Sequence, residues 1–199
     1  MTVLRMTLWG LAAAAIVGFV VLTATQNRPA PRTTDLGGVA ESIGGPFTLV
    51  DQNVAMRTEA DFKGRPTVIY FGFATCPDIC PTALGKLSGA LGVLEGDADK
   101  LNALFITVDP ERDTPELLKS YLAFEPRFVG LTGAQEDVDA ALDAYRVYRN
   151  KVLLEGSALG YTMDHSSLFY LMDAEGRFVA PIRDTLSVDE LAAELRKHL

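Results

Sequence analysis

The chain has 199 residues, a formal net charge of −8 at pH 7 and 48% hydrophobic residues. This length fits one ordinary domain plus a short appendage. The excess of acidic side chains argues against nucleic acid as a partner, because binding to nucleic acid depends on Lys and Arg side chains that neutralise phosphates.

The first segment of the chain is strongly apolar. Residues 6–24 contain no charged side chain, and the run is close to the roughly 20 residues that a helix needs to cross a bilayer. We predict a transmembrane anchor at residues 6–25, preceded by a short cytoplasmic N-terminus at residues 1–5. The alternative is a cleaved signal peptide, which would have a shorter apolar region and a better cleavage site than residues 23–27 offer. Both interpretations place the rest of the chain outside the cytoplasm, and we expect a single-pass protein of the cell inner membrane whose soluble domain faces the periplasm.

A linker and one folded domain are predicted to follow. Residues 26–45 are rich in Pro and Gly, contain few apolar side chains and show no periodicity. Such a composition cannot bury enough surface to fold, so we predict a flexible linker. Residues 46–199 are long enough to form a sizeable core and are predicted to make one domain.

Within this domain, apolar runs alternate with helical patterns. In its first half we predict a short strand at residues 47–50 in a hairpin with the stretch around Val54, buried strands at 67–73 and 104–108, and a helix at 81–94 between them. In its second half we predict a helix that Thr114 caps and Pro115 begins, a helix at 136–145, strands at 128–131, 147–153, 168–172 and 178–182, and a last helix from Ser187 to Leu199. The fold class is therefore α/β, and the order of elements predicts a thioredoxin-like mixed sheet flanked by helices.

The only two cysteines, Cys76 and Cys80, follow directly after the strand predicted at residues 67–73. In open α/β sheets, ligands gather at the carboxyl ends of the central strands. Side chains four residues apart lie on one face of a helix about 5–6 Å apart, so these sulfurs can form a disulfide or converge on a metal ion. A helix N-terminus also favours the thiolate form. The pair would close almost no loop, which argues against a structural disulfide.

Two thiolates leave a metal ion short of ligands, and the chain has two histidines. His198 is the penultimate residue of the last predicted helix, where a solvated cation is the expected role. His165 lies just before the strand at 168–172, in a segment that we expect to be a loop facing the cysteine helix. We therefore predict metal ligands at Cys76, Cys80 and His165.

Three further residues lie close to these ligands in the sequence. Met163 is a candidate thioether ligand, although packing against the core explains it equally well. Asp78 and Asp164 are candidate hydrogen-bond acceptors that would orient the imidazole; helix capping explains Asp78 equally well, and solvation explains Asp164. A Cys₂His set suits copper in either oxidation state or zinc, and three ligands with an open side suit a metal ion that is handed on.

Four ordered segments resemble the Sco/SenC family of copper proteins. They are FGFATCPDICPTAL at residues 71–84, VDPERDTPELLKSYL at 108–122, GLTG at 130–133 and YTMDHSSLFYLMDAEGRF at 161–178. The resemblance implies a thioredoxin-like fold, an N-terminal anchor, and Cu⁺ or Cu²⁺ bound by Cys76, Cys80 and His165. The chain departs from many members at Ala74 and Thr75, where they carry Thr-His, so it offers no further histidine near the cysteines.

The resemblance also implies a function. Members of the family assemble the binuclear copper centre of cytochrome c oxidase, by copper delivery, by reduction of the target's cysteines, or by both. The implied partner is the copper-bearing subunit of the oxidase, and another exported copper chaperone or a thiol reductant is a further candidate. The alternatives are a thiol-disulfide oxidoreductase that uses the redox pair Cys76 and Cys80 without obligatory copper, and a thioredoxin-like peroxidase. A peroxidase would need an Arg near one reactive cysteine, and no Arg follows Cys76 within ten residues.

Overall fold

The computed structural model describes residues 43–157 and 159–199, so the predicted cytoplasmic N-terminus, anchor and most of the predicted linker lie outside the described residues. Within the described ranges, no helix is both long and apolar enough to cross a bilayer. The first described residues are already attached to the body of the domain, because the backbone N–H of Gly44 donates a hydrogen bond of 2.9 Å to the carbonyl of Ala144.

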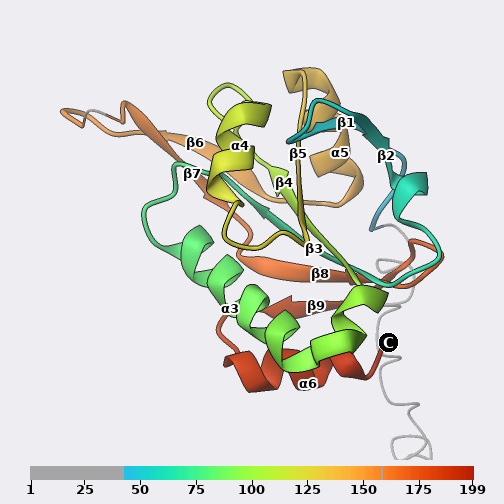
Figure 1. The fold of residues 1–199 in the computed structure, drawn as a ribbon. Coiled ribbons are helices and arrows are strands. Elements are labelled where there is room, and N and C mark those ends of the chain that lie inside the picture. The colour runs from blue at the N-terminus through green and yellow to red at the C-terminus, as the bar shows by residue number, and fades with distance from the viewer. Residues whose placement is uncertain (1–42, 158) are drawn as a thin grey trace, which may run out of the picture. The chain divides into compact units, whose positions relative to one another are not determined.

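A seven-stranded mixed sheet forms the centre of the domain (Figure 1). Its strands lie in the order β2 (Met56–Thr58), β1 (Thr48–Asp51), β5 (Phe128–Thr132), β4 (Asn102–Thr107), β3 (Thr67–Gly72), β8 (Leu168–Met172) and β9 (Phe178–Arg183). Strands β3, β4 and β5 are parallel to one another, whereas β1 and β8 run antiparallel to their neighbours. This arrangement confirms the predicted mixed α/β sheet.

Helices cover both faces of the sheet (Figure 1). Helices α3 (Ile79–Leu94) and α6 (Val188–Arg196) pack together on one face, and α4 (Pro115–Tyr121) and α5 (Gln135–Ala144) lie on the other. Two short 3-10 helices, Glu59–Phe62 and Glu95–Lys100, complete the connections. Because strands β3 and β4 are covered on both sides, every residue in them is buried.

The structure confirms the predicted elements of the sheet and shifts some boundaries. Thr114 caps α4, since its hydroxyl accepts a hydrogen bond of 3.2 Å from the N–H of Leu117. Helix α3 begins at Ile79, two residues before the predicted start at Pro81. Pro81 is tolerated inside the first turn because the N–H groups there have no partner within the helix. Helix α6 ends at Arg196 rather than continuing to Leu199.

One strand was missing from the sequence prediction. Residues Tyr161–His165, which we expected to be a loop, form strand β7 and pair antiparallel with β6 (Arg149–Leu153). The signal was the pair of glycines, Gly156 and Gly160, between two runs of hairpin length. These strands form a separate two-stranded sheet that projects from the body of the domain (Figure 1).

Candidate metal centre

The two cysteines lie where β3 passes into α3. Strand β3 ends at Gly72, and the cysteines are free thiols in the loop and the first turn of the helix that follows. Cys80 is fully buried, whereas Cys76 is half-buried. A Cβ atom at Gly72 would lie only 2.9 Å from Cys80 Sγ, so a side chain larger than hydrogen at this position would displace the sulfur. The backbone N–H of Cys80 points to Cys76 Sγ at 3.5 Å, which keeps the two residues together.

His165 reaches this sulfur pair from the end of β7. Its Nε2 atom lies 3.5 Å from Cys80 Sγ, and its Nδ1 atom lies 3.1 Å from the carbonyl oxygen of Ser166. A carbonyl oxygen only accepts hydrogen bonds, so Nδ1 carries the proton and the lone pair of Nε2 faces Cys80. This is the tautomer that can bind a metal ion through Nε2.

Two aromatic rings hold the imidazole edge-on. The ring centroids of Phe73 and His165 are 5.8 Å apart at an interplanar angle of 88°, and those of Tyr70 and His165 are 6.2 Å apart at 87°. Both aromatic residues belong to β3 or follow it directly, so the strand that leads to the cysteines also packs against the histidine.

Burial determines the charge of the Cys80 thiol and of the His165 imidazole that contacts it. Burial raises the pKa of the Cys80 thiol above its ordinary value and lowers the pKa of His165. Cys80 and His165 are therefore a neutral thiol and a neutral imidazole at pH 7, joined by an S–H···N contact. A metal ion that binds here takes the place of the thiol proton.

The structure brings two of the three predicted ligands into contact. In the part of the chain that is described, no three Cys, His, Asp or Glu side chains lie close enough together to hold a metal ion as they stand. Cys76 is held next to Cys80 by the backbone, so a three-ligand site requires these groups to draw closer. The chemistry of the donors, two sulfurs and one neutral imidazole nitrogen, suits copper.

A cavity of about 330 Å³ opens beside these residues. One side of the cavity is formed by the segment that carries the cysteines, and the other by β7 and the residues just after it. The lining residues are Phe73, Cys76, Pro77, Asp78, Ile79, Thr162, Met163, Asp164, His165 and Ser167. Cys76 and His165 therefore face the opening, while Cys80 lies behind them. Asp78 and Asp164 place acidic side chains in the lining, which favours the approach of a cation.

Of the alternatives stated for the two acidic residues near the ligands, the structure agrees with solvation for Asp164 and does not show helix capping by Asp78. Asp78 precedes α3, but its side chain makes no capping hydrogen bond to the backbone of the helix. Asp164 is exposed, and the carbonyl of Ser166 orients the imidazole in its place. His198 follows the end of α6, and its Nε2 lies 3.9 Å from a carboxylate oxygen of Glu194 rather than near the cysteines.

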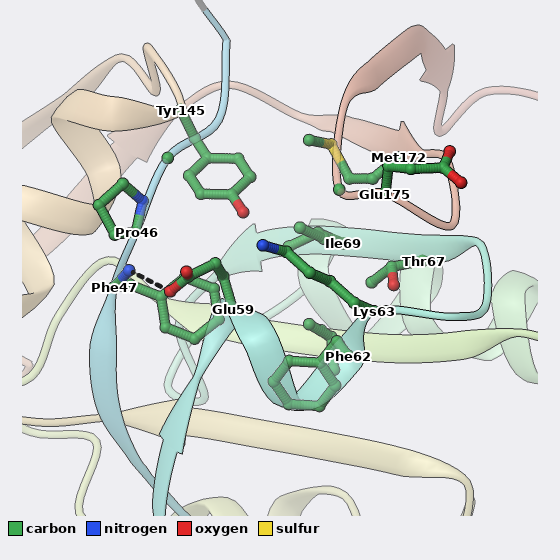
Figure 2. Close-up of a pocket in the computed structure, with 13 residues that line it drawn as sticks. Pro46, Phe47, Glu59, Phe62, Lys63, Thr67, Ile69, Tyr145, Met172 and Glu175 are labelled. Carbon is green, nitrogen blue, oxygen red and sulfur yellow. Dashed lines mark hydrogen bonds between the residues drawn. The ribbon is translucent and has the colours of Figure 1, made fainter.

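A second cavity, of about 220 Å³, lies at the opposite end of β3 (Figure 2). Its walls include Phe47, Tyr145 and Met172, and the side chains of Glu59 and Lys63 enter it. Burial raises the pKa of Tyr145 to about 12, so its hydroxyl stays protonated. No cysteine or histidine lines this cavity, and it is therefore not the candidate metal centre.

Comparison with known proteins gives consistent matches over the whole domain. Residues 37–199 match the family model described as SCO1/SenC. The chain is 40% identical to the SCO2-like protein RP587 of Rickettsia prowazekii over 150 residues, which are 75% of this chain and 73% of that protein.

Two solved structures extend the similarity to the fold. The structure of Bradyrhizobium japonicum ScoI with copper bound is 48% identical with a TM-score of 0.73, over 79% of this chain and 99% of that one. The crystal structure of yeast Sco1 with copper bound is 40% identical with a TM-score of 0.68, over 79% of this chain and 91% of that one.

Proposed function

The chain belongs to the SCO1/SenC family, and on this premise we propose that it binds one copper ion through Cys76, Cys80 and His165 and passes it on during the assembly of cytochrome c oxidase. The observation that carries the proposal is the contact of 3.5 Å between Cys80 Sγ and His165 Nε2. Support also comes from the structural similarity to ScoI and Sco1, both of which were solved with copper bound.

The chain's own residues account for binding. His165 presents a lone pair because Ser166 holds the proton of its other nitrogen. Cys80 gives up its thiol proton when the metal ion arrives, and Cys76 lines the cavity through which the ion enters. Three ligands leave one side of the ion accessible, so an acceptor protein can approach without the site first unfolding.

The acceptor and the location belong to the same proposal. The family resemblance supports the copper-bearing subunit of cytochrome c oxidase as the acceptor, with another exported copper chaperone or a thiol reductant as a further partner. The uncharged run at residues 6–25 supports an inner-membrane anchor, and residues 46–199 then face the periplasm.

A thiol-disulfide reductase is a second candidate function, favoured by the unequal exposure of the cysteines. Cys76, the accessible thiol, would attack a target disulfide as the thiolate and form a mixed disulfide. Cys80 would then attack Cys76 Sγ and release the target as a dithiol, leaving a Cys76–Cys80 disulfide. The target gains two electrons and this chain loses them, so a further thiol reductant must restore the pair.

Anaerobic titration of the reduced protein with Cu(I) tests the copper proposal. We expect one ion per chain and a large loss of affinity in Cys76→Ser, Cys80→Ser and His165→Ala. With Cu(II), sulfur ligation should give an intense charge-transfer absorption. A disulfide cannot supply two thiolates, so the oxidised protein should bind Cu(I) poorly. Unchanged affinity in His165→Ala would remove the histidine from the ligand set.

A further inference from the structure

The turn between β4 and α4 contacts the β6–β7 hairpin through Arg112. The guanidinium of Arg112 lies over the ring of Tyr161, 3.8 Å from its centroid, and its Nη1 donates a hydrogen bond of 3.0 Å to the carbonyl of the same residue. Its Nε also pairs with Asp109, which is buried. A planar guanidinium can make these three contacts at once, whereas a Lys ammonium cannot.

Tyr161 is held from several sides. Its hydroxyl donates a hydrogen bond of 2.8 Å to Asp109 Oδ1. The ammonium of Lys151 also lies over the ring, at 4.0 Å from the centroid, and pairs with Glu111 at 2.7 Å. Asp109 and Arg112 therefore contact Tyr161 directly, and Glu111 of the same turn acts on it through Lys151.

The hairpin needs such contacts because its backbone does not join the main sheet. Strands β6 and β7 pair only with each other in the described part of the chain, and an isolated two-stranded hairpin is marginally stable. Side chains must therefore set its position relative to α3, which carries Cys80.

The contacts at Tyr161 extend to His165. The two residues are the first and last of β7 and, being four apart in a strand, lie on the same face. The Arg112 guanidinium also lies 5.7 Å from the Phe73 ring, which packs edge-on against the His165 ring. One Arg thus contacts both the strand that carries the histidine and a ring that packs against it.

The burial of Arg112 indicates that these contacts constrain it. Its side chain is 20% exposed, and its Nη2 atom is buried without a hydrogen-bond partner among the described residues. A buried donor without a partner is unfavourable. If Arg112 served only to form the turn between β4 and α4, its guanidinium could stay in solvent and avoid this cost. Instead it lies between Phe73 and Tyr161.

We propose that Arg112 and Tyr161 form a clamp that positions His165 against Cys80. Both are positioning residues, because neither is among the proposed copper ligands. The expected effect on copper affinity rests on the proposed function. The position of His165, in contrast, can be measured in the metal-free protein. Residues outside the ligand shell that orient a ligating histidine commonly change metal affinity by about 10- to 100-fold.

The test compares substitutions in the reduced full-length chain in detergent. Arg112→Lys keeps the charge but loses the stacked plane, and Tyr161→Leu loses the ring. Tyr161→Phe keeps the ring and loses only the hydroxyl. The matched control is Arg127→Lys, because Arg127 also pairs with a buried carboxylate, Glu125, but lies away from the hairpin.

We expect Arg112→Lys and Tyr161→Leu to lower Cu(I) affinity about tenfold or more. The Cu(I) affinity of Tyr161→Phe should lie between that of these two variants and that of wild type. Arg127→Lys should bind copper with wild-type affinity. In the metal-free protein, Arg112→Lys and Tyr161→Leu should also broaden the NMR signals of the His165 ring and speed hydrogen exchange of the β7 amides.

Two results would overturn the clamp. One is that Arg112→Lys and Tyr161→Leu leave the metal-free His165 signals and β7 exchange at wild-type values. The other is that they lower the urea midpoint only as Arg127→Lys does, with copper affinity unchanged. Failure of the proposed function is distinguishable, because wild type and His165→Ala would then bind copper equally while the metal-free signals still report on the clamp.

Discussion

If Cys80 is a copper ligand as proposed, the ionisation of its thiol is linked directly to copper binding. Burial raises the pKa of its thiol, so the metal-free protein keeps this proton at pH 7. Binding of Cu(I) to the thiolate must release it, and affinity should rise up to about tenfold per pH unit for each proton displaced. Calorimetric titration in two buffers with different ionisation enthalpies measures the number of protons released. Cys80→Ser should release fewer, and a wild-type count of zero would contradict the neutral thiol.

Asp113 is a second buried group with a consequence for pH dependence. Its side chain accepts hydrogen bonds from the Thr107 hydroxyl at 2.7 Å and the Ala74 N–H at 3.0 Å, while its other oxygen has no partner among the described residues. Burial raises its pKa from 3.8 to about 6. Because the pKa is raised in the folded state, the stability that Asp113 contributes is present below about pH 4 and is lost as pH rises to 6 and above.

The difference between wild type and Asp113→Asn isolates this effect from other carboxylates. A shift from 3.8 to about 6 corresponds to about 3 kcal/mol of unfolding free energy. We expect Asp113→Asn to gain up to this amount relative to wild type between pH 4 and pH 7. Urea unfolding at a series of pH values gives the comparison. A pH-independent difference would mean that the carboxyl titrates at its ordinary value in the folded protein.

At the scale of elements, two glycines report on different kinds of packing. A Cβ atom at Gly130 of β5 would lie 2.5 Å from Leu122 Cδ1 and 3.4 Å from Leu118 Cβ, because α4 packs closely on this strand. A Cβ atom at Gly85 of α3 would meet no atom within 4 Å.

These glycines therefore predict opposite effects of the same substitution. Gly130→Ala should lower the free energy of unfolding by about 1–3 kcal/mol through overpacking. Gly85→Ala should raise it by about 0.5–1 kcal/mol, because alanine loses less backbone entropy in a helix. Chemical denaturation of both variants provides the measurement, and equal signs would contradict the packing described for α4 on β5.

The elements also differ in how well the sequence predicts them. Strands β3 and β4 were predictable because burial on both faces demands unbroken apolar runs, and α4 because Thr114 and Pro115 mark its start. Strand β7 was not, because its hairpin is partly exposed on both faces and shows no clear alternation.

The same reasoning applies to the candidate metal centre. The spacing of Cys76 and Cys80 and their place after β3 are local, so the sequence alone indicated them. His165 followed from topology and from the scarcity of histidines. The carbonyl of Ser166 and the clamp of Arg112 on Tyr161 depend on side-chain orientation or on contacts between residues far apart in the chain, which no local pattern reveals.

At the scale of the whole molecule, copper would join two parts that the backbone leaves separate. Cys80 belongs to α3, whereas His165 belongs to a hairpin outside the main sheet. A ligand that binds only the folded state adds about 2.7 kcal/mol of stability when its free concentration is 100 times Kd. We expect Cu(I) to raise the thermal midpoint of the reduced protein and to slow hydrogen exchange in β7. The increase should vanish in Cys76→Ser, and a midpoint that copper leaves unchanged in wild type would contradict the bridging site.

The two ends of β3 lie near different features of the domain: the start of the described chain at one end and the cysteines at the other. Gly44 approaches Met172, which pairs with Thr67 at the start of β3, whereas Cys76 follows the last residue of that strand. Six residues of strand, about 20 Å, therefore separate the point where residues 1–42 join from the candidate metal centre. If residues 6–25 anchor the chain as proposed, residues 26–42 are the part of the predicted linker left between the anchor and the domain, and their extended length of at most about 60 Å limits how far from the membrane the domain can meet its acceptor.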